Sequence, residues 1–321
     1  MPLVRNSKYQ APFYLFSGHL ETIIPALFRN TGRIDYHRER ILTNDDDFLD
    51  LDWSIIGADK LAIISHGLEG DSHRPYVKGM VKAINMEGWD ALAWNFRGCS
   101  GEMNKLCPFY HSGKSEDLDW VVQHAARVGY KKIVLIGFSI GGNITLKYLG
   151  EQKDRVTSAV KAAVTFSVPC HLQAGAYHLT QSFNRIYLNR FLKSLKFKII
   201  SKEAVLPGSY DLTGIDKISN FQEFDDRYTA PVNGFKNAIH YWTESSSIYQ
   251  LPTIQIPTLL VNSQNDPFLP LECFPVEQAK NNPYLFLEMP ETGGHVGFFN
   301  SFTSDMYWSE ERAIEFINKY A

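Results

Sequence analysis

The chain of 321 residues has few cysteines, no large excess of either charge and no long apolar run. Its four cysteines are irregularly spaced and form no Cys-x-x-Cys pair, so the sequence supports neither a zinc knuckle nor a redox pair. With 32 Lys and Arg against 35 Asp and Glu, the formal net charge of −3 gives no sign of nucleic-acid binding. No apolar run approaches the roughly 18 residues of a membrane span. We expect reduced thiols at Cys99, Cys107, Cys170 and Cys273.

The start of the chain also lacks the pattern of an export signal. Its first apolar stretch is only about six residues long and contains Pro12, which does not fit a signal core. The composition, with 44% hydrophobic and 21% charged residues, is typical of a globular protein and excludes a disordered chain. The sequence therefore predicts a cytoplasmic globular protein without a transmembrane segment.

From residue 60 onward, short apolar runs alternate with stretches in which apolar residues recur at helical spacing. Nearly continuous apolar runs are typical of parallel strands that are buried on both faces. The expected strands are 60–65, 91–96, 132–138, 160–168, 258–262 and 284–288, and the expected helices are 75–87, 116–127, 140–150 and 309–320. A β-hairpin over residues 38–56 precedes them. This pattern predicts an α/β fold with a mostly parallel central sheet and helices on both faces.

Residues 169–252 interrupt this alternation and separate two expected core strands. Within them, apolar side chains recur every four positions, as on one face of a helix. These side chains are Phe183, Tyr187, Phe191 and Leu195. The same stretch has no acidic residue from 171 to 202 but carries the cations Arg185, Arg190, Lys193, Lys196, Lys198 and Lys202. We interpret 169–252 as a helical cap inserted into a single domain that spans residues 1–321.

A serine lies where a buried strand turns directly into a helix. The segment Gly137-Phe-Ser139-Ile-Gly141 fits a nucleophile elbow, a sharp turn that presents a serine at the carboxyl edge of a sheet. Glycines two residues before and after Ser139 are needed because side chains there would collide across the turn. The pentapeptide alone could be an ordinary glycine-rich turn, but its strand–turn–helix context favours a nucleophile.

A serine hydroxyl is a poor nucleophile without an adjacent base. His295 lies in a glycine-rich loop after the last expected strand and can supply that base, and the chain order serine, acid, histidine is expected for such a sheet. Asp266 follows the preceding strand, where it can orient the imidazole. Asp225 and Asp226 are rivals for the acid, but they lie within the expected cap. The predicted catalytic residues are Ser139, Asp266 and His295.

Two backbone N–H groups are expected to bind the oxyanion of the reaction. One belongs to Ile140, the residue after the serine, and the other to Leu68, in the loop after an early strand. We expect the neighbouring His66 to shape this loop rather than to act as a base. Cys99 lacks the context of a nucleophile and is interpreted as a structural thiol, and Arg97 is interpreted as a residue that links neighbouring loops.

A series of short motifs runs through nearly the whole chain in a fixed order. They are Gly18-His19-Leu20-Glu21-Thr22, His66-Gly67-Leu68-Glu69-Gly70, Asn95-Phe96-Arg97-Gly98-Cys99-Ser100-Gly101, Gly137-Phe138-Ser139-Ile140-Gly141-Gly142-Asn143, Phe224-Asp225-Asp226, Thr229-Ala230-Pro231, Gly234-Phe235, Tyr241-Trp242, Asn265-Asp266-Pro267 and Gly294-His295-Val296-Gly297. In these motifs the chain resembles the α/β-hydrolases of the YheT-like subfamily, bacterial relatives of mammalian abhydrolase-domain proteins and yeast medium-chain ester synthases. The resemblance implies the α/β-hydrolase fold with Ser139, Asp266 and His295 as its triad.

These observations predict a serine esterase that needs neither a cofactor nor a metal. Its expected substrates are short- to medium-chain or lipid-like esters, cleaved through an acyl-enzyme on Ser139. Acyl transfer to an alcohol is an alternative that uses the same triad. A non-catalytic binding protein on a hydrolase scaffold is a weaker alternative, since all three triad residues are present.

The basic helix of the expected cap has two interpretations. Its apolar face could pack on the core while Arg185, Arg190, Lys193 and Lys196 are solvated. Alternatively, the helix could wall the acyl pocket, or contact an anionic lipid surface through its basic face as a peripheral membrane protein does.

Overall fold

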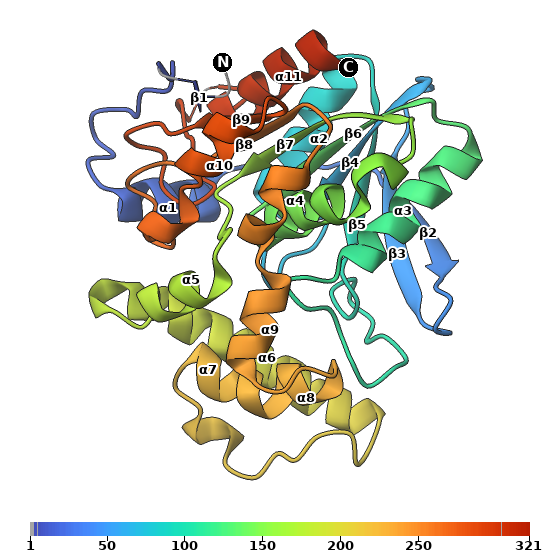
Figure 1. The fold of residues 1–321 in the computed structure, drawn as a ribbon, viewed down its shortest axis with the longest axis vertical. Helices are drawn as coiled ribbons and strands as arrows, with labels where there is room; N and C mark the ends of the chain where they lie inside the picture. Colours follow the sequence, from blue (N-terminus) through green and yellow to red (C-terminus); the bar gives the residue numbers. More distant parts are fainter. Residues whose placement is uncertain (1–2, 5, 303) are drawn as a thin grey trace.

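The computed structural model describes residues 3–4, 6–302 and 304–321. Nine strands form one sheet in the order β1-β9-β8-β7-β6-β4-β5-β3-β2 (Figure 1). Their bounds are β1 Leu3–Val4, β2 His37–Leu42, β3 Phe48–Ser54, β4 Lys60–Ser65, β5 Asp90–Asn95, β6 Lys132–Phe138, β7 Val160–Phe166, β8 Thr258–Val261 and β9 Leu285–Glu288. Only the pairs β2–β3 and β3–β5 are antiparallel among the described strands. The prediction of a mostly parallel sheet is therefore confirmed.

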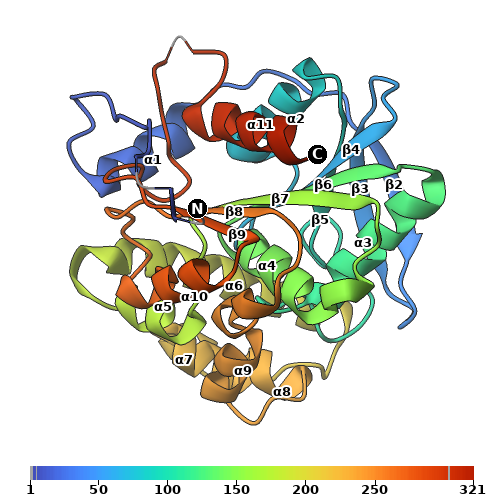
Figure 2. The same cartoon turned by 45° about the horizontal axis from the view of Figure 1, so that its top comes forward.

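Helices cover both faces of the sheet, as Figure 2 shows. Successive residues of a strand point to opposite faces, so Leu61 and Ile63 of β4 enter one apolar cluster while Ala62 and Ile64 enter another. Helices α3 and α4 pack in the first cluster, and α2 and α11 pack in the second. The bounds are α2 Pro75–Met86, α3 Ser115–Val128, α4 Ile140–Gln152, α10 Val276–Asn281 and α11 Trp308–Tyr320. This division explains why a central parallel strand such as β4 is apolar along most of its length.

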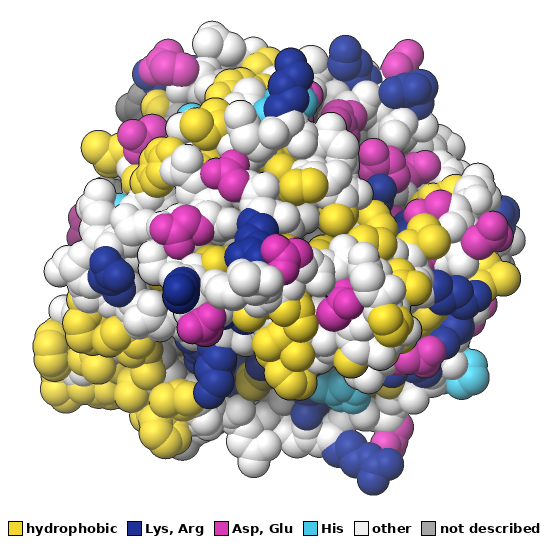
Figure 3. Space-filling model, turned by 90° about the horizontal axis from the view of Figure 1, so that it is seen from below, with side chains coloured by type: hydrophobic (Ala, Val, Ile, Leu, Met, Phe, Trp, Pro, Cys, Tyr) yellow, Lys and Arg dark blue, Asp and Glu magenta, His cyan; other side chains and the backbone are white. Residues whose placement is uncertain are grey.

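A helical segment, residues 172–253, joins β7 to β8 and lies at the bottom of Figure 1. It contains α5 Leu172–His178, α6 Arg185–Val205, α7 Phe221–Phe224, α8 Ala230–Val232 and α9 Ala238–Ser245. Figure 3 views the molecule from this side and shows hydrophobic side chains next to Lys and Arg side chains. The assignment of residues 169–252 as a cap within one domain stays a prediction.

The expectation that four apolar residues share one face of the basic helix is wrong for Phe183. This residue lies in the short 3-10 turn Ser182–Asn184, before α6 begins, and is 51% exposed. Ser182 has a φ of +40°, a left-handed conformation that interrupts the helix between α5 and α6. Tyr187 and Leu195 are buried on α6 as expected, and Phe191 is a partly buried side chain that packs against the same core cluster.

The cations of this stretch differ in burial. Lys198 and Lys202 of α6 are buried, whereas Arg185, Arg190 and Lys193 are exposed. Lys202 donates hydrogen bonds to the carbonyls of Asn104 and Leu106, so distant loops supply its acceptors. Among the described residues, no helix is both long enough and apolar enough to cross a membrane.

Candidate active site

The serine of the elbow lies between β6 and α4 in a strained conformation. Ser139 has φ +55° and ψ −122°, a backbone conformation that residues other than glycine rarely adopt. A Cβ atom on Gly137 would lie 2.6 Å from the Cα of Gly142, and one on Gly141 would overlap the carbonyls of Ser65 and His66. Glycines are therefore required on both sides of Ser139, as the sequence suggested.

Three side chains from different loops meet at this turn. His295 Nε2 lies 3.0 Å from Ser139 Oγ, and His295 Nδ1 lies 2.9 Å from Asp266 Oδ2. The side chain of Asp266 is fully buried, and the ring of Phe268 stacks on the imidazole at 3.9 Å. An ionised carboxylate only accepts, so it favours the tautomer with the proton on Nδ1, which leaves Nε2 to accept from the serine hydroxyl.

Helix α1 (Gly18–Phe28), far away in sequence, holds the loops that carry the acid and the histidine. Thr22 Oγ1 accepts the backbone N–H of His295 at 2.9 Å. Glu21 Oε1 accepts from the Asn265 side-chain amide at 2.8 Å, and Asn265 Oδ1 accepts the backbone N–H of Gly294 at 3.0 Å. We call Glu21, Thr22, Asn265 and Gly294 the N-terminal clamp. Reasoning from the sequence missed the role of these residues, although three of the motifs named above contain them.

The clamp is also packed tightly. A Cβ atom on Gly18 would overlap the Asn265 carbonyl, so α1 sits directly against the loop of Asp266. Glu21 is fully buried, and its Oε2 has no hydrogen-bond partner among the described residues. Burial raises the pKa of Glu21, which favours the neutral form of this carboxyl.

The two residues expected to bind the oxyanion line the same cavity as Ser139 and His295. Within the described part of the chain, the backbone N–H groups of Leu68 and Ile140 have no protein acceptor. A Cβ atom on Gly67, the residue before Leu68, would lie 3.2 Å from the Ser139 Cβ. Glycine therefore allows this loop to approach the serine closely.

His66 lies behind this loop rather than beside the serine hydroxyl. Its Nε2 accepts the backbone N–H of Phe96 at 3.1 Å, and its Nδ1 lies 2.8 Å from the carbonyl of Gly67. Burial lowers the pKa of His66 to about 3, so the ring is neutral. The expectation that His66 shapes the loop agrees with these contacts.

Arg97 and Cys99 also occupy structural positions. The guanidinium of Arg97 binds both carboxylate oxygens of Asp117, at 2.9 and 2.7 Å, and reaches Asp45 at 2.7 Å, which ties the β2–β3 turn to α3. Cys99 Sγ lies 3.0 Å from Nζ of Lys198, and burial raises the pKa of this thiol to about 11. A thiol that stays protonated is a poor nucleophile.

The match to known proteins decides the family. The profile of the alpha/beta hydrolase fold matches residues 62–302. The chain belongs to the alpha/beta hydrolase family. It is 34% identical to the YheT protein of Escherichia coli, in an alignment that covers 94% of this chain and 90% of YheT. This agrees with the YheT-like motifs in the sequence.

More distant relatives of this alpha/beta hydrolase have lipid-related names. The monoacylglycerol lipase of Saccharomyces cerevisiae is 31% identical, over 81% of this chain and 59% of the lipase. The human phospholipase ABHD3 is 28% identical, over 92% of this chain and 75% of the phospholipase. The solved esterase Pf2001 of Pyrococcus furiosus aligns with a TM-score of 0.59 at 20% identity, covering 89% and 93% of the two chains, which shows a shared fold.

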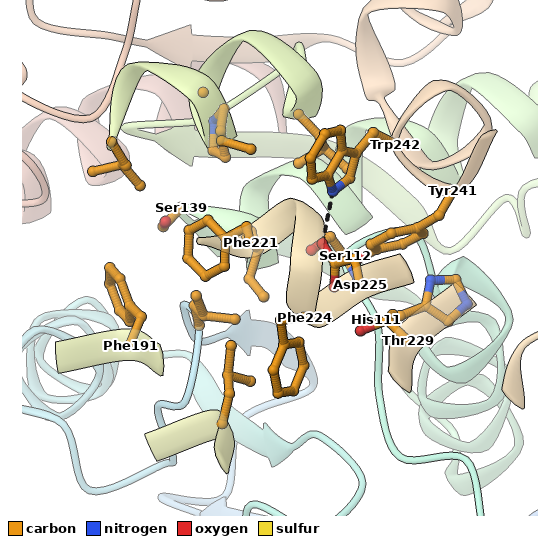
Figure 4. Close-up of a pocket in the computed structure, with 18 of the residues that line it drawn as sticks. His111, Ser112, Ser139, Phe191, Phe221, Phe224, Asp225, Thr229, Tyr241 and Trp242 are labelled. Carbon is orange, nitrogen blue, oxygen red and sulfur yellow. Dashed lines mark hydrogen bonds between the residues drawn. The ribbon is translucent and has the colours of Figure 1, made fainter. Parts of the chain in front are cut away.

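A cavity of about 110 Å³ in this alpha/beta hydrolase opens onto Ser139 and His295 (Figure 4). Since one water-sized group needs roughly 10–15 Å³ of such space, the cavity has room for several of them. Its apolar walls come mainly from the helical segment, with Leu172, Leu179, Phe191, Leu195, Phe221 and Phe224. Polar groups also line it, among them Asp225, which the sequence analysis had considered only as a rival catalytic acid.

Proposed function

We propose that this protein hydrolyses carboxylic esters through an acyl-enzyme on Ser139. The observation that carries the proposal is the hydrogen-bonded series from Asp266 through His295 to Ser139, placed on an elbow that faces an apolar cavity. The relatives named as a lipase and a phospholipase support ester bonds as the target.

The geometry supports a two-step reaction. Ser139 Oγ attacks the acyl carbon while His295 Nε2 takes its proton, and Asp266 stabilises the imidazolium through Nδ1–H. The backbone N–H groups of Leu68 and Ile140 bind the oxygen that becomes negatively charged. Nε2 then gives the proton to the leaving alcohol. A water molecule, deprotonated by His295, releases the acid in the second step and restores the serine.

We further propose that the helical segment caps the site and sets the size of the substrate. Its aromatic and aliphatic side chains give the cavity walls that would hold an acyl chain in contact with apolar surface. The limited volume favours short- to medium-chain acyl groups. Phe191 is important here because it lines the cavity on α6 while its neighbour Leu192 is buried in the core.

The test is Ser139→Ala, assayed with p-nitrophenyl esters of two to sixteen acyl carbons. Loss of a serine nucleophile costs about a million-fold in turnover in a comparable triad. We expect this loss together with an unchanged melting temperature and no labelling by a fluorophosphonate probe. Most of the wild-type rate in the purified variant would contradict the proposal. Product analysis of the wild type with added alcohol separates hydrolysis from acyl transfer, and a wild type that reacts with neither probe nor ester would indicate a binding protein.

A further inference from the structure

A buried carboxyl group lines the proposed substrate cavity, and it lies far in sequence from the candidate catalytic residues. Asp225 begins the π-helical turn Asp225–Thr229 after α7, and it is only 8% exposed. It lines the same cavity as Ser139, in the part of the wall that also contains Ser112, Thr229 and Trp242 (Figure 4). Most of the remaining wall is apolar, so this carboxyl is a marked polar feature of the cavity.

The hydrogen-bond donors to the carboxyl group of Asp225 are neutral side chains. No Lys, Arg or His forms an ion pair with it among the residues that the structure describes. Trp242 Nε1 donates a hydrogen bond to Oδ2 at 2.8 Å, and the Thr229 side chain also contacts the carboxyl. A carboxylate offers about four lone-pair sites, so these two donors leave acceptor capacity unused. Burial raises the pKa of Asp225 to about 7.

A hydroxyl group fits this part of the cavity as a partner for Asp225, whichever protonation state the carboxyl has. His111 lines the same part of the cavity, where burial and then the charges of Lys114, Lys147 and Arg97 lower its pKa to about 3. A hydroxyl group can donate to the ionised carboxylate and accept from the protonated carboxyl, so it binds Asp225 in either state.

We infer that Asp225 binds a hydroxyl group of the ester substrate and thereby favours hydroxylated esters over esters that lack one. The inference rests on the proposed ester hydrolysis at Ser139. The structural alternative is that Asp225 only anchors Trp242, joining α7 to α9. The hydroxyl could belong to the alcohol part of the ester or to its acyl part, and matched pairs of substrates distinguish these sources.

The first experiment measures kcat/KM of the wild type on two pairs. One pair is 3-hydroxypropyl butanoate with propyl butanoate, and the other is ethyl 6-hydroxyhexanoate with ethyl hexanoate. We expect the hydroxylated ester to be preferred in one pair, which identifies the side of the ester that reaches Asp225. Equal or lower kcat/KM for the hydroxylated ester in both pairs overturns the inference without any variant. Failure to hydrolyse the plain esters would instead contradict the proposed function.

The second experiment compares Asp225→Asn with the control Asp226→Asn. Asparagine keeps an oxygen for the Trp242 N–H but cannot accept as a carboxylate does, so we expect the hydroxylated-to-plain ratio of kcat/KM to fall about tenfold or more. Asp226 is exposed and accepts the backbone N–H of Ala238 outside the cavity, so its variant should keep the wild-type ratio. If Asp225→Asn lost kcat/KM equally on the hydroxylated and the plain ester, Asp225 would only anchor Trp242. An equal fall of the ratio in both variants would also overturn the inference.

Discussion

The backbone N–H of His295 donates a hydrogen bond to the hydroxyl of Thr22, 273 positions earlier in the chain. The same hydroxyl donates to the carbonyl of Gly18 at 2.6 Å, so its orientation is fixed. The candidate base therefore depends on a helix that contributes no group to the reaction itself. Thr22 is a positioning residue, and its effect should be measurable as a change in rate rather than in binding.

Thr22→Val removes this hydroxyl while keeping the shape of the side chain. A misplacement of about 1 Å in a catalytic group can cost about a hundredfold in rate, so we expect kcat to fall roughly ten- to a hundredfold with KM nearly unchanged. Thr22→Ser keeps the hydroxyl and should retain most of the activity. Equal kcat values for the valine and serine variants would show that the hydroxyl does not position His295.

Asp266→Asn tests the acid of the predicted triad. The amide favours the wrong tautomer of the imidazole, and we expect turnover to fall by about four orders of magnitude with weak fluorophosphonate labelling retained. The measurement is steady-state hydrolysis of a plain ester by the folded variant. If Asp266→Asn turned over normally while Asp225→Asn or Asp226→Asn lost that activity, the acid would lie in the helical segment instead.

Phe191→Ala tests whether α6 sets acyl-chain length. The smaller side chain opens the cavity, and because each buried CH₂ is worth about 0.8 kcal/mol, an ester two carbons longer should gain up to roughly tenfold in relative kcat/KM. Phe183→Ala is the matched control, since Phe183 is exposed and does not line the cavity. An unchanged chain-length profile in Phe191→Ala would restrict α6 to a structural role.

The buried His111 should make stability depend on pH. Burial depresses its folded pKa from 6.5 to about 3, so its contribution to stability is present above pH 6.5 and is lost as pH falls toward 3. Asp225, whose pKa is raised to about 7, contributes with the opposite sign, so the test compares variants rather than absolute stabilities. Between pH 6.5 and 5, the wild type should lose about 2 kcal/mol of unfolding free energy relative to His111→Gln. Urea unfolding at both pH values measures this difference. If the unfolding free energies of the wild type and His111→Gln changed equally with pH, the lowered pKa of His111 would be wrong.

The sequence predicted the sheet well because its parallel strands are buried on both faces and therefore read as continuous apolar runs. It also predicted which loops bring Ser139, Asp266 and His295 together, since the elbow and the order of strands determine that geometry. Their catalytic roles stay predictions. Strand β1 was not foreseen, because two residues, Leu3 and Val4, are too short to show any periodicity.

Features that depend on distant contacts could not be predicted. Lys198 has no acidic neighbour in sequence, yet Glu69, on the loop after β4, lies 2.8 Å from its Nζ. The 3-10 turn that separates Phe183 from α6 depends on the backbone conformation of Ser182, which helical spacing does not reveal. The clamp residues of α1 were visible as a motif, but only the fold shows what they bind.

The clamp also has a consequence for the order in which the protein is synthesised. His295 is added 273 residues after Thr22, the clamp residue that binds its backbone. At about 5–20 residues per second, this interval is on the order of 14 to 55 seconds, during which α1 has no histidine loop to hold. A nascent chain that has not reached residue 295 therefore lacks the imidazole that lies 3.0 Å from Ser139 Oγ in the full chain. The candidate triad can therefore assemble only after residue 295 has been synthesised.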